Sequence, residues 1–125
     1  MNNLIIDTAG EKIFLKIITE DKEYINKLDN CRENFDEIVK IIFNFLHKNN
    51  INLSKIENVF INQGPGKYTS IRSAISIAKA LKISKNVNIY GYYSTQINNN
   101  NYDTLMKLLE EGRLTKNFIQ PKYLN

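Results

Sequence analysis

The sequence holds only one cysteine, Cys31, and one histidine, His47, among its 125 residues. A single cysteine argues against a disulfide scaffold and fits a reducing compartment, so we expect a cytoplasmic protein. A zinc site needs three or four ligands, which these two residues cannot supply, so no metal site is expected. No serine or cysteine stands in a recognisable nucleophile turn that His47 could serve as a base, and hydrolase chemistry is therefore disfavoured.

Long apolar runs are also missing from the sequence. None approaches the ~20 residues of a membrane span, and the polar residues Asn2, Asn3 and Asp7 do not fit a signal peptide, so no membrane association is expected. The length supports one domain with a modest core. The net charge of +4 comes from lysines scattered among acidic residues. It does not predict direct, sequence-specific binding of nucleic acid.

What the sequence does contain is a regular order of predicted strands and helices. Apolar alternation and turn residues predict strands over 3–8, 12–19 and 23–28, joined as an antiparallel meander. Helical periodicity predicts a helix over 33–48, capped by Asn30 or Asn34, and a second helix over 69–83. Two further strands are predicted over 56–61 and 88–92. The order β-β-β-α-β-α-β is that of a single ribonuclease H-like lobe of the actin-like ATPase superfamily, an α/β fold with a mixed sheet.

This lobe is expected to occupy residues 1–94. The asparagine run from Asn98 to Asn101 predicts a linker. Residues 102–111 predict a short helix, which Gly112 ends, and a tail follows it. Residues 95–125 are therefore expected to form a linker, a short helix and a tail.

The segment between the fourth predicted strand and the second helix is the most informative in the chain. Gly64 and Gly66 allow a positive φ and close backbone approach, Pro65 stiffens the turn, and Thr69 can cap the helix. Such a junction either binds an anion at the helix N-terminus or packs against another surface. The spacing of a phosphate loop is absent, although Lys67 could still reach an anion. No cofactor is assigned.

Asp7 ends the first predicted strand. Ribonuclease H-like nucleases and actin-like kinases place a metal- or phosphate-handling carboxylate there, but that chemistry needs several converging carboxylates. None of the nearby acidic residues sits at a predicted strand end beside Asp7; these are Asp29, Glu33, Asp36 and Glu37. A structural Asp7 that accepts a turn N–H from Ala9 or Gly10 is the other interpretation. No catalytic residue is assigned, and the weak candidates for a ligand site are Asp7, Gly64, Gly66, Lys67 and Thr69.

The first predicted helix has an apolar face wider than a sheet face requires, and the second has a face of small side chains beside its sheet-facing stripe. In the first helix one stripe holds six residues, and Ile41 and Phe43 widen it; the stripe is Phe35, Ile38, Val39, Ile42, Phe45 and Leu46. The second helix has a sheet-facing stripe (Ile71, Ala74, Ile75, Ala78 and Leu81) and a neighbouring face of mostly small side chains (Ser73, Ser76, Ile77 and Ala80). Small side chains let another helix approach closely. The two faces predict either helices buried deeply in a small domain or a helix pair offered to a partner.

These residues resemble the TsaB (YeaZ) family of tRNA threonylcarbamoyladenosine biosynthesis proteins. The family's first strand ends in Asp-Thr-Ala or Asp-Thr-Ser, as Asp7 to Ala9 do here. Its signature, Gly-Pro-Gly-Ser-Phe-Thr-Gly-x-Arg followed by a helix with Ala-Lys, is matched at Gly64, Pro65, Gly66, Thr69, Arg72, Ala78 and Lys79, with Tyr68 in place of phenylalanine. The segment 87–94 resembles the family's next strand, and 121–124 resembles a motif near family C-termini.

The resemblance also has departures. Lys67 and Ser70 stand where the family has a serine and a glycine, and Ala74 and Ala80 stand where glycines are usual. The family normally has a second lobe, of which residues 95–117 would be the remnant, so the chain is expected to be shortened to one lobe. Actin-like nucleotide chemistry uses the cleft between two lobes. The catalytic relative TsaD holds a metal with paired histidines on a helix, and residues 30–42 here contain none.

The resemblance therefore implies a non-catalytic subunit that binds and activates a TsaD-like catalytic subunit in tRNA modification beside the anticodon. It also implies a TsaE-like ATPase in the complex, indirect contact with tRNA, and a homodimer when the partner is absent. The residues expected to face the partner are Phe43, Ser73, Ser76, Ile77 and Ala80, with the glycine turn fixing the second helix against the first strand. Two alternatives stay open: a small phosphotransferase or nuclease that uses Asp7 and the glycine turn, or a homodimeric scaffold.

Overall fold

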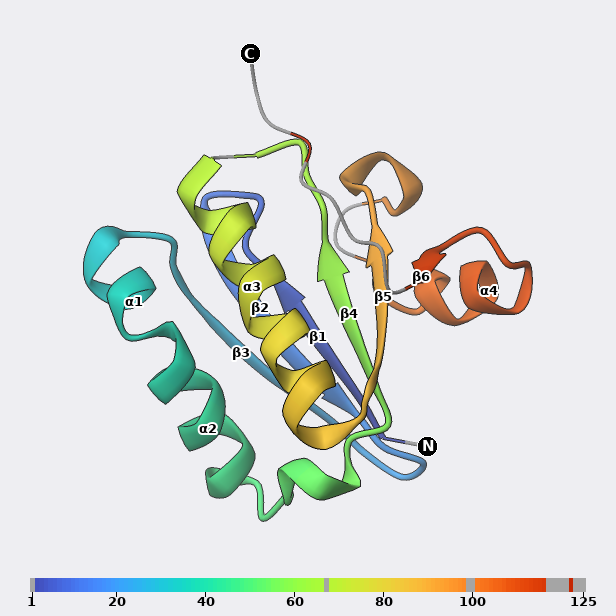
Figure 1. Cartoon of the computed structure of the whole chain (residues 1–125), viewed down its shortest axis with the longest axis horizontal. Coiled ribbons are helices and arrows are strands. Elements are labelled where there is room, and N and C mark those ends of the chain that lie inside the picture. The colour runs from blue at the N-terminus through green and yellow to red at the C-terminus, as the bar shows by residue number, and fades with distance from the viewer. Residues whose placement is uncertain (1, 67, 99–100, 117–121, 123–125) are drawn as a thin grey trace.

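In the computed structural model, a six-stranded mixed sheet lies between two helical layers (Figure 1). The structure describes residues 2–66, 68–98, 101–116 and 122, with Tyr68 described by its backbone alone. The strands are β1 (Asn3–Asp7), β2 (Lys12–Ile18), β3 (Glu23–Asp29), β4 (Asn58–Asn62), β5 (Asn88–Tyr92) and β6 (Thr115–Lys116). The helices are α1 (Arg32–Asp36), α2 (Ile38–Lys48), α3 (Tyr68–Lys85) and α4 (Thr104–Glu110), with short 3₁₀ turns at Leu53–Lys55 and Ser94–Gln96.

The sheet order is β3-β2-β1-β4-β5-β6. β1 pairs antiparallel with β2 and parallel with β4, β4 pairs parallel with β5, and β5 pairs antiparallel with β6. Three antiparallel strands followed by parallel crossovers confirm the predicted mixed α/β lobe. The carboxyl ends of β1, β4 and β5 consequently meet at one edge, where open α/β sheets carry their sites.

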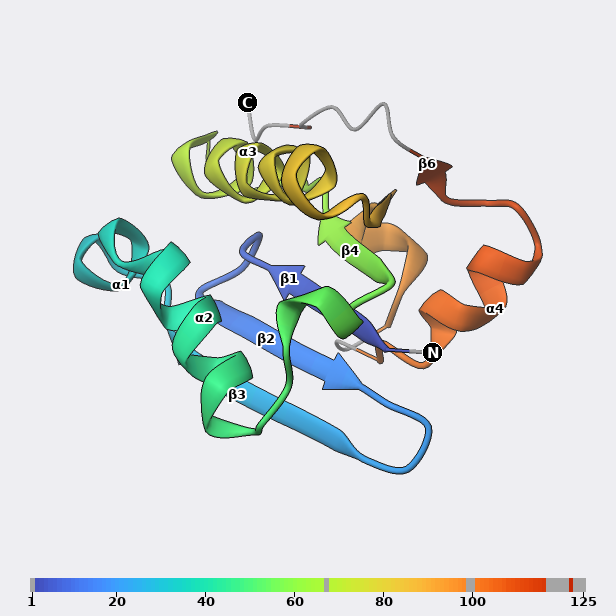
Figure 2. The ribbon, with the colours of Figure 1, turned by 60° about the horizontal axis from the view of Figure 1, so that its bottom comes forward.

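Each face of the sheet has its own apolar core. Ile13, Leu15 and Ile17 of β2 are fully buried on the face covered by α2 and α3, while the alternate residues of β2 lie on the other face. On that second face, Ile5 and Phe60 pack against buried side chains of residues 102–110, which consist of Tyr102, Asp103 and α4 and are called the α4 segment below. Figure 2 shows α1, α2 and α3 on one side of the sheet and α4 on the other. The central strands are buried on both faces because a helical layer covers each of them.

The predicted helix over 33–48 is wrong as a single element, because α1 and α2 are separated at Glu37, whose φ and ψ are −103° and 13°. No residue of α1 is fully buried and only Phe35 among its apolar residues packs on the core, whereas α2 buries four residues, so α1 is the more weakly anchored of the two. The predicted caps are also wrong. Cys31 precedes α1 without a side-chain cap. Asn30 donates instead to the carbonyls of Thr8 and Gly10, and Asn34 donates to the carbonyl of Asp29.

Other boundaries move by small amounts. α3 begins at Tyr68, so Thr69 lies inside its first turn rather than before it, and β4 runs over Asn58–Asn62 instead of 56–61. The predicted short helix is present as α4, and β6 was not predicted. The division of the chain at residue 94 stays a prediction. Part of the asparagine run and most of the tail, including Pro121, Tyr123 and Leu124, lie outside the described residues.

An amide ladder crosses the amino ends of the three parallel strands. Asn58 donates to Asn3 at 2.9 Å and accepts from Asn88 at 3.3 Å, and the strand register places these three residues side by side. Asn3 and Asn58 are both almost fully buried. Because buried amides must find partners, a one-residue slip of a strand would break the ladder, so the ladder favours the observed register. Within the part of the chain that the structure describes, no helix is long and apolar enough to cross a membrane.

Candidate functional site

The carboxyl edge of the sheet holds a buried polar cluster centred on Asp7, which is 3% exposed. One carboxylate oxygen of Asp7, Oδ1, accepts from the backbone N–H of Ala9 at 3.2 Å and from the side-chain amide of Asn62 at 3.1 Å. The other oxygen, Oδ2, accepts from the hydroxyl of Tyr102 at 2.9 Å. The carboxylate is thus held by donors from β4, from its own turn and from the segment before α4. The turn contact with Ala9 is one of the two expected for a structural aspartate.

Asn62, at the end of β4, lies next to the carboxylate of Asp7, and its chemistry limits what that carboxylate can bind. Its amide nitrogen donates to Asp7, while its oxygen accepts from the backbone N–H of Gly64 at 2.8 Å and from Ser94 at 3.2 Å. A carboxylate at this position could share a cation with Asp7, but an amide presents a donor to it instead. Among the described residues, no group of three or more histidine, cysteine or acidic side chains could hold a metal ion.

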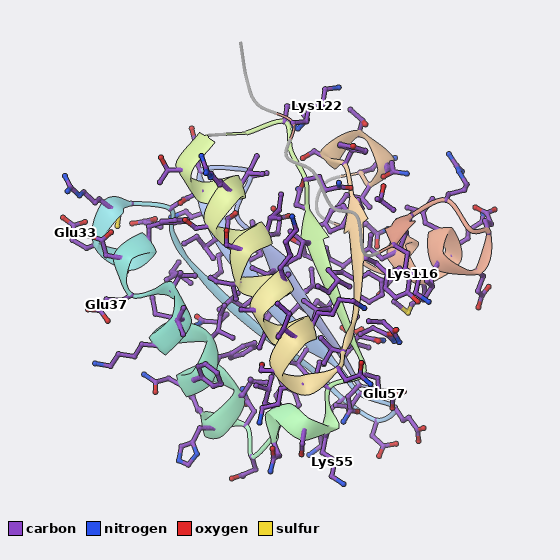
Figure 3. The ribbon with its side chains drawn as sticks, viewed as in Figure 1. Glu33, Glu37, Lys55, Glu57, Lys116 and Lys122 are labelled. Atoms are coloured by element: carbon purple, nitrogen blue, oxygen red, sulfur yellow. The ribbon has the colours of Figure 1, made fainter. Side chains whose placement is uncertain are left out.

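The acidic residues weighed as helpers for Asp7 lie elsewhere. Asp29 forms an ion pair with Lys12 at the outer edge of the sheet, and Asp36 pairs with Arg32 on α1. Glu33 and Glu37 point away from the sheet on the outer side of the molecule (Figure 3). None of the four therefore joins Asp7 in a carboxylate cluster.

Two tyrosines border the carboxylate of Asp7. Burial, followed by the negative charge of Asp7, raises the pKa of the Tyr102 hydroxyl above its usual range. The same causes, in the same order, raise the pKa of Tyr92, which is completely buried. Both phenols are therefore neutral at physiological pH. Neither tyrosine was singled out by the sequence, because Tyr102 is 95 residues from Asp7 along the chain and no spacing rule connects them.

The glycine turn after β4 is packed on several sides. Gly64 has a φ of 109°, and a Cβ built on it would lie 2.2 Å from the carbonyl oxygen of Lys122. A Cβ on Gly66 would lie 2.6 Å from the carbonyl oxygen of Ala9 and 2.7 Å from Ile71. Lys122 donates its backbone N–H to Gln63 at 2.7 Å, and Figure 3 shows this residue beyond the end of β4. The turn thus joins β1, α3 and the tail by close packing.

Two side chains add hydrogen bonds to this junction. Thr8 donates its hydroxyl to the carbonyl of Ser70 in the first turn of α3, and Ser70 donates to Asn30. Thr69 is exposed in the same turn, and Lys67 lies outside the described residues. The role of Asp7, Gly64, Gly66, Lys67 and Thr69 as a ligand site stays a prediction.

The outer face of α2 exposes apolar side chains, and that of α3 exposes small ones. On α2, Val39 is 49% exposed and Phe43 is 46% exposed, and residues four apart share one helix face. Val39 therefore does not belong to the buried stripe in which it was predicted, and its exposure was missed. On α3, Ser76 and Ala80 are exposed, and Ser73 and Ile77 are half-buried. The predicted sheet-facing stripe of α3 is buried throughout.

A groove of about 700 Å³ separates the carboxyl-terminal halves of these two helices. Phe43, Leu46 and His47 line it from α2, and Leu81, Ser84 and Lys85 line it from α3. The groove adjoins the exposed side of Phe43. The residues predicted to face a partner thus lie on the two helices of one layer, and their role stays a prediction.

Comparisons with known proteins point to one family. The family model described as "TsaD: tRNA N6-adenosine threonylcarbamoyltransferase" matches residues 29–104. The tRNA threonylcarbamoyladenosine biosynthesis protein TsaB of Buchnera aphidicola subsp. Schizaphis graminum is 30% identical over 95 residues, which cover 75% of this chain and 45% of that protein. This chain therefore spans less than half the length of that relative.

Solved structures share the fold. YeaZ from Pseudomonas aeruginosa superposes with a TM-score of 0.71 at 17% identity, covering 89% of this chain and 50% of that one. RuvC from T. thermophilus, solved in complex with a Holliday junction substrate, gives a TM-score of 0.60 at 12% identity and covers 93% of this chain and 99% of that one. At these identities the likeness concerns the fold alone.

Proposed function

This chain belongs to the TsaD family of tRNA N6-adenosine threonylcarbamoyltransferases and has TsaB proteins among its relatives, and on this basis we propose that it is a TsaB-like, non-catalytic subunit. It binds and activates a TsaD-like catalytic subunit that attaches threonylcarbamoyl to the adenosine beside the tRNA anticodon. A TsaE-like ATPase completes the complex. The chain works in the cytoplasm, contacts tRNA only through the complex, and associates with itself when the catalytic subunit is absent.

The observation that carries this proposal is the exposed layer formed by α2 and α3. Val39 and Phe43 each leave about half of their side-chain surface in water. Burying that surface against an apolar partner would be favourable by roughly 25 cal/mol per Å². The small side chains Ser76 and Ala80 on α3 let a partner helix approach the backbone closely. The exposed apolar side chains of α2 and the small side chains of α3 are suited to packing against a pair of helices from another subunit.

The surroundings of Asp7 support a non-catalytic role. Its two carboxylate oxygens already accept three hydrogen bonds, from Ala9, Asn62 and Tyr102. A metal or phosphate at this carboxylate would displace Tyr102 and leave buried polar groups without partners, which costs roughly 1–3 kcal/mol for each group. The phosphotransferase and nuclease alternatives both require this carboxylate, so neither is favoured.

Reconstituted tRNA modification tests the proposal. The catalytic subunit, the TsaE-like ATPase, tRNA, ATP and the threonylcarbamoyl donor are combined with and without this chain. We expect modification to rise by at least tenfold when the chain is present, and we expect the chain alone to modify no tRNA. Equal modification with and without the chain contradicts the proposed role, as does modification by the chain alone.

A further inference from the structure

The α4 segment covers the second face of the sheet through few polar contacts. Tyr102, Leu105 and Leu108 are each at most 3% exposed and pack against Ile5 and Phe60 of the central strands. α4 has only seven residues, from Thr104 to Glu110. A helix of that length does not hold its structure alone in water, so α4 depends on what it docks against.

One buried hydrogen bond ties this segment to the end of β1. The hydroxyl of Tyr102 donates to Oδ2 of Asp7 at 2.9 Å, and both residues are nearly fully buried. A second side-chain hydrogen bond from the segment to β1 runs from the amide of Asn3 to the sulfur of Met106 at 3.6 Å. Sulfur is a weak acceptor, so the bond to the carboxylate is the stronger of the two.

The surroundings of Tyr102 keep its hydroxyl in place as a donor. Its ring lies 6.2 Å from the ring of Phe14, and the ammonium of Lys16 stands 5.6 Å above it. Lys16 in turn pairs with Glu23 at 3.4 Å. Because burial and the charge of Asp7 raise the pKa of Tyr102, the hydroxyl retains its proton at physiological pH.

We propose that the hydrogen bond between Asp7 and Tyr102 is a latch that holds the α4 segment closed over the sheet, and that this segment can be released as a unit while the rest of the lobe stays folded. The latch joins a segment that buries three side chains, and whose continuation β6 pairs with β5 over two residues, to a strand that is buried along its whole length. Local openings of such weakly connected units are general in proteins. Release uncovers Ile5, Phe60 and Tyr92 and exposes the carboxylate of Asp7 to water.

Hydrogen exchange of the full chain tests the latch. Tyr102→Phe removes the hydroxyl and keeps the ring. Tyr90→Phe is the matched control, because Tyr90 packs on the same apolar cluster and stacks on Phe60. In Tyr102→Phe we expect the amides of α4 to exchange on the order of ten- to a hundredfold faster, the range for losing a hydrogen bond to a charged group. The amides of β1 and β4 should stay slower than those of α4, although those that open only by global unfolding should accelerate by up to the same factor, because the hydrogen bond is absent from both the released and the unfolded states.

Two results overturn the proposal. One is unchanged exchange of α4 in Tyr102→Phe. The other is acceleration of α4 by the same factor in Tyr90→Phe, which would mean that the hydrogen bond to Asp7 has no specific effect on this segment. Exchange of the unaltered protein supplies a further check that needs no variant. The latch requires the amides of α4 to open with a lower free energy than those of β1 and β4, and equal opening free energies contradict it. The test involves no catalytic subunit, so its outcome is independent of the function proposed above.

Discussion

At the scale of single residues, the chemistry at the carboxyl edge of the sheet depends on the side chain beside Asp7. Asn62 donates to the carboxylate, so the pair is stable without a cation. Two carboxylates at the same positions would repel each other, and either a proton or a metal would have to compensate. The amide therefore makes this edge a structural junction. Ser94 and Gly64 complete it by donating to the oxygen of Asn62.

The tyrosines near Asp7 give a pH dependence with a defined sign. Tyr92 and Tyr102 face Asp7 and each other, and Lys16 also faces Tyr102. Their pKa values are raised in the folded protein, so the folded state favours the neutral phenols. Their contribution to stability is fully present below the unfolded tyrosine pKa of about 10 and is lost as the pH rises above it.

Ultraviolet absorbance, which distinguishes phenolates from neutral phenols, should show that Tyr92 and Tyr102 ionise later than the other tyrosines. Two of the seven tyrosines should ionise only when alkaline unfolding occurs, as judged by circular dichroism on the same samples. Tyr102→Phe should remove one of these two late phenols and lower the pH of unfolding. If all seven tyrosines ionise together while the protein is still folded, the described environment of Asp7 is wrong.

Among the single residues, the sequence pointed to Asp7 and the glycine turn but not to their partners. Asp7 was found because it follows an apolar strand. Tyr102 was not, since its contact with Asp7 depends on how the α4 segment crosses the sheet. Val39 was assigned to the buried stripe from helical periodicity alone. Periodicity gives the angle of a residue around a helix, but it does not tell how far the neighbouring elements reach around that helix.

At the scale of elements, the junction between β1 and α3 depends on a close backbone approach at Gly66. Gly66→Ala would place a Cβ within 3 Å of both Ala9 and Ile71. The backbone would have to shift, and we expect a loss of roughly 1–3 kcal/mol in the free energy of unfolding. Gly10→Ala is the matched control, since a Cβ there meets nothing within 4 Å. Denaturant unfolding of both variants makes the measurement, and equal midpoints would contradict the packing described here.

The exposed face of α2 carries the second prediction at this scale. Phe43→Asp should weaken binding to the catalytic subunit by at least tenfold, because it places a charge where apolar contact is expected. Folding should be little affected, since Phe43 is about half exposed. Ile25→Asp is the control: Ile25 is 60% exposed and stands opposite Lys16 in the strand register, on the second face of the sheet. Equal affinities of the two variants for the catalytic subunit would remove α2 from the interface.

The elements themselves were largely predictable, for reasons that can be stated for each. The alternation in β2 identifies its buried face directly, and the stripe of α3 from Ile71 to Leu81 follows the helical period without interruption. The break at Glu37 carries no proline or glycine to mark it, and α1 contains no fully buried residue that would extend the packing of α2. β6 has two residues, too few for any periodic pattern, and it depends on pairing with β5.

At the scale of the whole molecule, the described chain is one mixed sheet with a helical layer on each face (Figure 2). Asp7 and Asn62 lie buried at the carboxyl edge of the sheet, where Tyr102 of the α4 segment binds Asp7, while the apolar helical surface of α2 lies on the face opposite the α4 segment. This arrangement separates a buried polar cluster from an exposed apolar surface. We infer that the molecule acts through its surface.

Isothermal titration calorimetry of the purified chain with a TsaD-like catalytic subunit tests this central claim most directly. The account predicts a complex of one chain with one catalytic subunit at micromolar concentration. Its heat-capacity change should be negative, because apolar surface on α2 and α3 leaves water. The absence of any association at that concentration would contradict the account.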